Sequence, residues 1–145
     1  DVYKRQGMIS VSSAMDKTGA GKLLAKFCVD LLGGTPSPLF VAALLFLVSS
    51  FLTQFMSNTA TATLLCPIGV AIAQQIGASP HAVVMSITIG IACAYATPVG
   101  TPPNTLVLGP GGYRFMDYVK VGTPLIFVSF IVSMIVIPIV WPFFK

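Results

Sequence analysis

Two short stretches of this 145-residue sequence place polar groups among apolar residues. Residues 57–59 read Ser-Asn-Thr, and residues 97–105 contain three prolines, one glycine, three threonines and an asparagine. Hydroxyl, amide and carbonyl oxygens are hard ligands that suit alkali cations, whereas the free N–H groups at a helix start attract anions. The two stretches therefore predict a site where a small cation and an anion bind together.

Both stretches are predicted to begin a helix. Asn58 or Thr59 is a suitable N-cap, and Thr101 followed by Pro102 has the form of an N-cap with proline at the first helical position. Each helix N-terminus carries about half a positive charge, yet residues 31–113 contain no Lys or Arg to pair with an anion. A bound cation would supply the missing charge. Cation and anion would then promote each other's binding, which is the thermodynamic basis of symport.

The composition around these stretches indicates a polytopic α-helical membrane protein. Hydrophobic residues make up 55% of the chain and charged residues 8%, against about a quarter charged in soluble domains. Residues 31–113 contain no Asp, Glu, Lys or Arg, and so long an uncharged stretch cannot cover a water-soluble surface. The basic residues lie near the two ends of the chain and are interpreted as interfacial anchors. They do not form the clustered basic face that nucleic acid binding requires.

The N-terminal part of the chain is expected to hold three segments. Residues 1–6 resemble the translated end of a sequencing adapter and are interpreted as a non-native leader, with a native polar leader as the alternative. Residues 7–15 are predicted to be the end of a truncated transmembrane helix. In residues 16–34 charged residues recur every four positions opposite an apolar face, which predicts an amphipathic helix on the membrane surface.

Residues 35–77 predict a re-entrant hairpin. Two apolar arms, residues 39–51 and 64–76, flank the polar stretch 53–63. Each arm is shorter than the roughly 20 residues needed to cross a bilayer. A hairpin that dips to the midplane and returns fits that pattern, and two ordinary spans with a tight polar loop are the alternative.

Residues 80–110 predict a discontinuous transmembrane helix. Residues 82–96 are apolar and rich in small residues, which favours close helix packing, but the prolines and the glycine of 97–105 cannot remain α-helical. Unpaired backbone groups are costly in hydrocarbon, so such a break is tolerated where it lines a polar cavity. Residues 121–144 then predict the last full-length span, with Trp141 near one interface.

The two polar motifs, in this order, resemble the second-repeat signatures of the divalent anion–sodium symporter family. That family includes sodium-coupled dicarboxylate and citrate transporters. The matching residues are 57–62 (SNTATA) and 97–104 (TPVGTPPN), and the resemblance covers residues 7–145. It implies an all-α integral membrane fold, namely the second inverted repeat of an elevator-type transporter. It also implies a homodimer for the full-length protein.

The resemblance implies a role for each matching position. Four oxygen donors resemble one sodium site: Thr53, Ser57, Asn58 and the Gly100 carbonyl. A second group resembles residues that hold a substrate carboxylate or shape the turn around it: Ser57, Asn58, Thr59, Thr101 and Pro102. The family's first repeat, with its own Ser-Asn-Thr hairpin and sodium site, is missing from this chain. The chain alone is therefore predicted not to transport.

The leading hypothesis is the C-terminal half of a sodium-coupled symporter of divalent anions, most simply C4-dicarboxylates, in a bacterial inner membrane. A proton-driven or exchange-type anion transporter is the alternative, although proton coupling usually needs an acid or histidine within the membrane, and residues 31–113 hold no acid. A channel or an intramembrane enzyme is a third hypothesis. An enzyme would need a nucleophile with its base or metal ligands, and the sequence offers no base. A fragment without activity of its own is the fourth.

Other polar residues within the apolar segments receive structural interpretations. Serines and threonines in membrane helices often bond their own backbone or a neighbouring helix, and this is expected of four residues: Thr61, Thr63, Ser86 and Thr88. His81 is expected at an interface. The three cysteines lack metal-ligand spacing and are interpreted as small packing residues.

Overall fold

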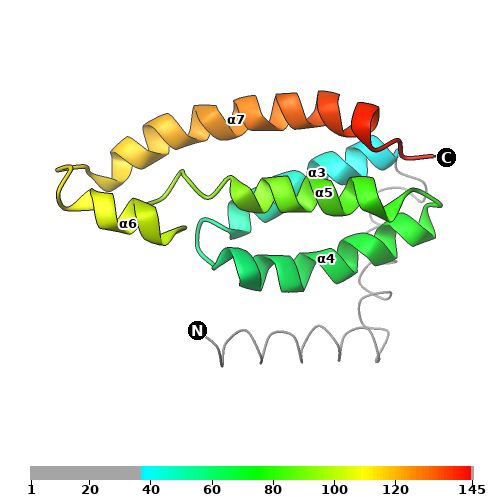
Figure 1. Ribbon diagram of the computed structural model, residues 1–145, viewed down its shortest axis with the longest axis horizontal. Helices are drawn as coiled ribbons and strands as arrows, with labels where there is room; N and C mark the ends of the chain where they lie inside the picture. The colour runs from blue at the N-terminus through cyan, green and yellow to red at the C-terminus, as the bar shows by residue number, and fades with distance from the viewer. Residues whose placement is uncertain (1–36, 145) are drawn as a thin grey trace.

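The computed structural model describes residues 37–144, and every regular element within that range is an α-helix (Figure 1). The helices are α3 (Pro38–Leu52), α4 (Asn58–Gln75), α5 (Pro80–Ala92), α6 (Pro102–Leu108) and α7 (Phe115–Val140). The expected all-α class is confirmed for this part of the chain. The predictions for residues 1–6, 7–15 and 16–34 lie outside the described residues.

Three of the helices begin with the same local chemistry. A hydroxyl residue occupies the N-cap and proline follows it at the first helical position, in Ser37-Pro38, Ser79-Pro80 and Thr101-Pro102. Proline is favoured there because its missing N–H would have no partner within the helix and its φ angle is already helical. The predicted helix start at Thr101-Pro102 is therefore confirmed.

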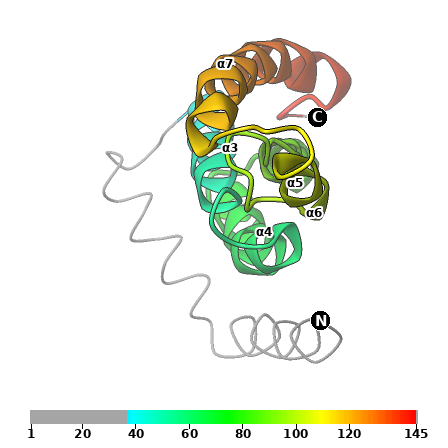
Figure 2. The ribbon, with the colours of Figure 1, turned by 90° about the vertical axis from the view of Figure 1, so that its left-hand side faces the viewer.

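Helices α3 and α4 run in opposite directions and are joined by a short turn, and α5 packs against both of them (Figures 1 and 2). Their shared core contains Val41, Leu45, Leu65, Ile72, Val83 and Ile87. The α3–α5 contact is close because Gly90 has no side chain. A Cβ atom there would lie 2.7 Å from the Phe46 carbonyl oxygen and would clash with Ser49 Oγ. Small residues at such contacts are typical of helix packing in membranes.

Helix α7 lies over this group of helices, and a large part of its surface is exposed (Figure 2). Its inner side contacts the group through an edge-to-face pair of Phe46 and Phe130, with ring centroids 5.4 Å apart. Gly122 also contacts the backbone of Tyr95 and Ala96. Within the described residues, α7 is the one helix that combines the length and the apolar composition needed to span a bilayer.

The structure changes three predicted boundaries. Helix α7 runs from Phe115 to Val140, whereas the last span was predicted over residues 121–144. Helix α5 ends at Ala92, so the irregular segment covers residues 93–101 and not 97–105, and two prolines of the predicted break lie in the first turn of α6. The second hairpin arm starts at Asn58, six residues before the predicted residue 64. The threonines in this first part of α4 are accommodated because Thr61 and Thr63 bond carbonyls of the preceding turn.

Candidate functional site

The turn between α3 and α4 lies against the irregular segment 93–101 (Figure 1). Gln54, within the turn, donates from Nε2 to the Cys93 carbonyl over 2.8 Å and accepts at Oε1 from the Ala96 N–H over 3.1 Å. Thr97 Oγ1 donates to the Gln54 carbonyl over 2.8 Å. The two polar stretches of the sequence are thus joined side by side, by residues that we had not assigned to the site.

We call this contact between the α3–α4 turn and residues 93–101 the junction. Thr53 lies at its centre, and the Thr53 side chain is fully buried. Its Oγ1 is 2.7 Å from Asn58 Oδ1 and 3.2 Å from the Ile91 carbonyl oxygen. A hydroxyl has one proton and two lone pairs. The proton can therefore be donated to either acceptor, and when it is donated to the Ile91 carbonyl, Asn58 Oδ1 no longer accepts from Thr53.

Gly100 reaches the same junction from the irregular segment. Its N–H donates to Thr97 Oγ1 over 3.2 Å. A Cβ atom at Gly100 would lie 2.9 Å from the Ala94 carbonyl oxygen and 3.3 Å from the Thr53 carbonyl oxygen. The backbones of Gly100 and Thr53 are therefore in close contact. Thr53 also bonds Asn58, and a sodium-binding role for these three residues stays a prediction.

Ser57 has a different local role from the one we predicted for it. It is the N-cap of α4, and its Oγ accepts from the Ala60 N–H over 3.2 Å. The prediction of Asn58 or Thr59 as the N-cap was wrong. Asn58 Oδ1 already accepts from Thr53 Oγ1, which leaves Ser57 to cap the helix.

Thr59, Thr101 and Pro102 lie at the starts of α4 and α6. The Thr101 side chain makes no capping hydrogen bond. Thr59 and Pro102 are exposed. Within residues 37–144, no side-chain hydrogen bond links these three residues to Thr53 or Asn58. They flank the junction in sequence, and their part in a site stays a prediction.

Asn104 is a further residue that we had not assigned to the site. Its Nδ2 donates to the Ala94 and Thr97 carbonyls, each over 3.1 Å. Thr105 Oγ1 donates to the Pro98 carbonyl over 2.6 Å. The start of α6 is thereby fixed to the irregular segment, whose backbone would otherwise lack partners.

The junction carries no formal charge. Among residues 37–144, the side chains of Asp, Glu, Lys and Arg are limited to Arg114, Asp117 and Lys120, all close to the start of α7. The described residues also contain no cluster of His, Cys, Asp and Glu able to hold a metal ion. The oxygen atoms at the junction belong to neutral hydroxyl, amide and carbonyl groups. As metal ligands, such oxygens suit an alkali cation better than a transition metal.

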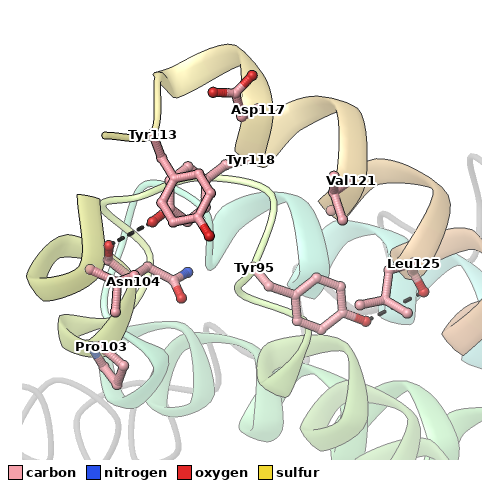
Figure 3. Close-up of a pocket in the computed structure, with 10 residues that line it drawn as sticks. Tyr95, Pro103, Asn104, Tyr113, Asp117, Tyr118, Val121 and Leu125 are labelled. Atoms are coloured by element: carbon pink, nitrogen blue, oxygen red, sulfur yellow. Dashed lines mark hydrogen bonds between the residues drawn. The ribbon is translucent and has the colours of Figure 1, made fainter. Parts of the chain in front are cut away.

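A cavity of about 460 Å³ lies beside α6 and the start of α7 (Figure 3). Its lining includes Tyr95, Asn104, Tyr113 and Tyr118. The Tyr118 hydroxyl donates to the Asn104 carbonyl over 2.9 Å, and the Tyr95 hydroxyl is 2.7 Å from Ser129 Oγ. None of the predicted cation or anion ligands lines this cavity.

Comparison with known proteins identifies relatives along nearly the whole chain. The family model described as "citrate transporter" matches residues 6–144. An uncharacterized transporter, YfbS, of Escherichia coli (strain K12) is 41% identical over 137 residues, which cover 94% of this chain and 22% of the relative. The sodium-dependent dicarboxylate transporter SdcS of Staphylococcus saprophyticus is 30% identical over 131 residues, which cover 90% of this chain and 25% of the relative. The chain thus spans about a fifth to a quarter of the length of these curated relatives.

Proposed function

The chain belongs to the citrate transporter family, and from that membership we propose that it forms the C-terminal part of a symporter that couples sodium to the uptake of C4-dicarboxylates. The family makes the protein a membrane transporter and not an enzyme. The coupling ion and the substrate class are the proposed parts. They are supported by the neutral oxygen atoms at the junction and by the similarity to SdcS, a sodium-dependent dicarboxylate transporter.

The observation that carries the proposal is the part-buried hydrogen bond between Thr53 and Asn58 beside Gly100. In this proposal the oxygens of Thr53 and Asn58 and the Gly100 carbonyl bind the ion, and the charged side chains of residues 37–144 lie apart from them near the start of α7. When sodium binds, the Thr53 proton is donated to the Ile91 carbonyl, which lies 3.2 Å from Oγ1. The lone pairs of Thr53 and Asn58 then both face the ion. Ser57 completes the proposed ligand set.

The dicarboxylate is proposed to bind at the start of α4. The first N–H groups of a helix have no partner within it, and α4 is long enough, at 18 residues, to present a substantial dipole. In this proposal Asn58 and Thr59 bind one carboxylate, with the hydroxyl of Thr101 and the turn at Pro102 beside it. The neighbouring sodium ion balances the negative charge, so each ligand raises the affinity for the other.

Helix lengths support a re-entrant position for the hairpin. Helix α3 has 15 residues, which at 1.5 Å per residue reach about 22 Å. Helix α4 has 18 residues, about 27 Å by the same measure. The hydrocarbon layer is about 30 Å thick, so both arms are shorter than a full crossing. In this proposal the α3–α4 turn and the irregular segment lie at membrane depth in a bacterial plasma membrane. The hairpin and broken helix move together in an elevator-like step within a homodimer, and the first repeat supplies the second carboxylate site.

The experiment that tests this function is uptake of labelled succinate into proteoliposomes that contain the full-length polypeptide. An inward sodium gradient is compared with an equal potassium gradient. The proposal predicts accumulation with sodium alone and competition by unlabelled malate. Equal uptake with both gradients would favour the proton-driven or exchange mechanism. Sodium-dependent uptake of sulfate in place of succinate would change the proposed substrate.

A further inference from the structure

The side chain of Gln54 replaces helix hydrogen bonds where the irregular segment begins. Gln54 is 6% exposed. Its Nε2 donates to the carbonyls of Ser50 and Cys93, both over 2.8 Å, and its Oε1 accepts from the Ala96 N–H over 3.1 Å. A primary amide has two donor hydrogens and one acceptor oxygen, so both ends of this amide are used.

These bonds join two elements that are far apart in the sequence. Cys93 and Ala96 lie 39 and 42 residues after Gln54. With α5 ended at Ala92, their backbone groups need new partners, and an unpaired buried polar group is costly. The amide of Gln54 supplies those partners from the hairpin turn. Removing it would leave the Cys93 carbonyl and the Ala96 N–H without the partners seen here.

Gln54 also lies between the two elements that carry the proposed sodium ligands Thr53 and Gly100. Thr53 is its neighbour in the chain. On the other side, the Gly100 N–H donates to Thr97 Oγ1, and Thr97 Oγ1 donates to the Gln54 carbonyl. Gln54 thus contacts both the element that carries Thr53 and the segment that carries Gly100.

We propose that Gln54 is a positioning residue that sets the separation of Thr53 and Gly100, and with it the affinity for sodium. This inference rests on the proposed function and adds a residue that does not bind the ion itself. It also means that the hairpin turn and the irregular segment move as one body. The amide is required because a glutamate carboxylate cannot donate to the carbonyls of Ser50 and Cys93.

The first test is the sodium dependence of succinate uptake by the full-length transporter with Gln54→Ala. Loss of correctly placed ligands raises the half-saturating sodium concentration by about tenfold or more, while the maximal rate at saturating sodium stays within about threefold of wild type. The matched control is Gln74→Ala, which removes an exposed amide near the other end of α4 and should leave both values unchanged. An unaltered half-saturating concentration in Gln54→Ala would overturn the proposal.

A second readout reports on the junction without sodium transport. The Cys93 side chain is 3% exposed, so a transporter whose other cysteines are replaced by serine should react slowly with a maleimide. Gln54→Ala should speed that labelling by about tenfold, because the irregular segment loses its link to the turn. Unchanged labelling would contradict the structural link. Faster labelling with unchanged sodium dependence would contradict the positioning role.

Thr97 provides the test if Gln54→Ala does not accumulate in membranes. Thr97→Val removes the hydroxyl that links the main-chain carbonyl of Gln54 with the Gly100 N–H. It loosens the same contact between the turn and the irregular segment without altering the amide, and should raise the half-saturating sodium concentration. Thr97→Ser keeps that hydroxyl and should behave as wild type. Equal behaviour of the two variants would overturn the proposal. A wild-type transporter indifferent to sodium would instead refute the proposed function, which keeps the two failures distinguishable.

Discussion

The Oγ1 atom of Thr53 lies 2.7 Å from Oδ1 of Asn58, across the turn that joins α3 and α4. Thr53 is the C-cap of α3, and Asn58 is the first residue of α4. One hydrogen bond therefore links the end of the first arm with the start of the second. Both oxygens belong to neutral groups, and both can face a cation once the Thr53 proton is donated to Ile91.

Replacing Thr53 by valine tests the hydroxyl without changing the shape of the side chain. An interaction with a charged group is worth about 1.5–3 kcal/mol, and about 1.4 kcal/mol corresponds to a tenfold change in affinity. We therefore expect Thr53→Val to raise the half-saturating sodium concentration by about tenfold to a hundredfold. The measurement is succinate uptake over a sodium series. Thr88→Val is the control, because Thr88 is exposed and bonds only the Val84 carbonyl of its own helix.

A methyl group at Gly90 is expected to separate α3 from α5. The added Cβ would meet the Phe46 backbone and the Ser49 hydroxyl, and overpacking of this kind costs about 1–3 kcal/mol. Gly90→Ala should therefore lower the melting temperature in detergent by several degrees. Gly109→Ala is the matched control, since no other atom lies within 4 Å of the added methyl group. Equal melting temperatures for the two variants would argue against the close α3–α5 contact.

The hydroxyl of Ser86 is expected to contribute a modest stability. It is buried and donates to the Ala42 carbonyl on α3. Interhelical hydrogen bonds in membrane proteins average about 0.6 kcal/mol and reach about 1.7 kcal/mol, so Ser86→Ala should destabilise within that range. The measurement is the free energy of unfolding, obtained from reversible unfolding in lipid bicelles. Thr88→Ala breaks no hydrogen bond between helices. A larger loss of stability in Thr88→Ala than in Ser86→Ala would contradict a stabilising bond between Ser86 and α3.

Much of the local structure could be predicted from residue types. The helix starts at Pro80 and Pro102 follow from the missing N–H and fixed φ of proline. The four hydroxyl residues interpreted as structural are confirmed in that role. Thr61, Thr63 and Thr88 bond carbonyls of their own helix, and Ser86 bonds a neighbouring one.

The remaining features depend on contacts between distant segments. Three consecutive residues could each have capped α4, and the choice of Ser57 follows from the bond that Asn58 makes with Thr53. The residues around Gln54 in the sequence do not indicate its role. Two of the three hydrogen-bond partners of its amide are backbone groups about 40 residues away. Only the tertiary arrangement shows that its amide is needed there. The sodium and carboxylate ligand sets stay predictions for the same reason, since they depend on ions and on a first repeat.

The chain alone is expected not to transport. It spans about a fifth to a quarter of the length of its curated relatives, and the proposed second carboxylate site belongs to the first repeat. Proteoliposomes that contain only these 145 residues should show no succinate uptake above that of empty liposomes under a sodium gradient. Sodium-dependent accumulation by the chain alone would contradict the two-repeat proposal.

The most direct test of the central claim is Asn58→Ala in the full-length transporter, measured as succinate uptake under an inward sodium gradient. Asn58 is the residue proposed to contact both the ion and the carboxylate, so its loss should abolish sodium-dependent uptake at physiological sodium. Gln75→Ala, which alters an exposed amide at the far end of the same helix, should retain it. Wild-type sodium-dependent uptake by Asn58→Ala would contradict the account.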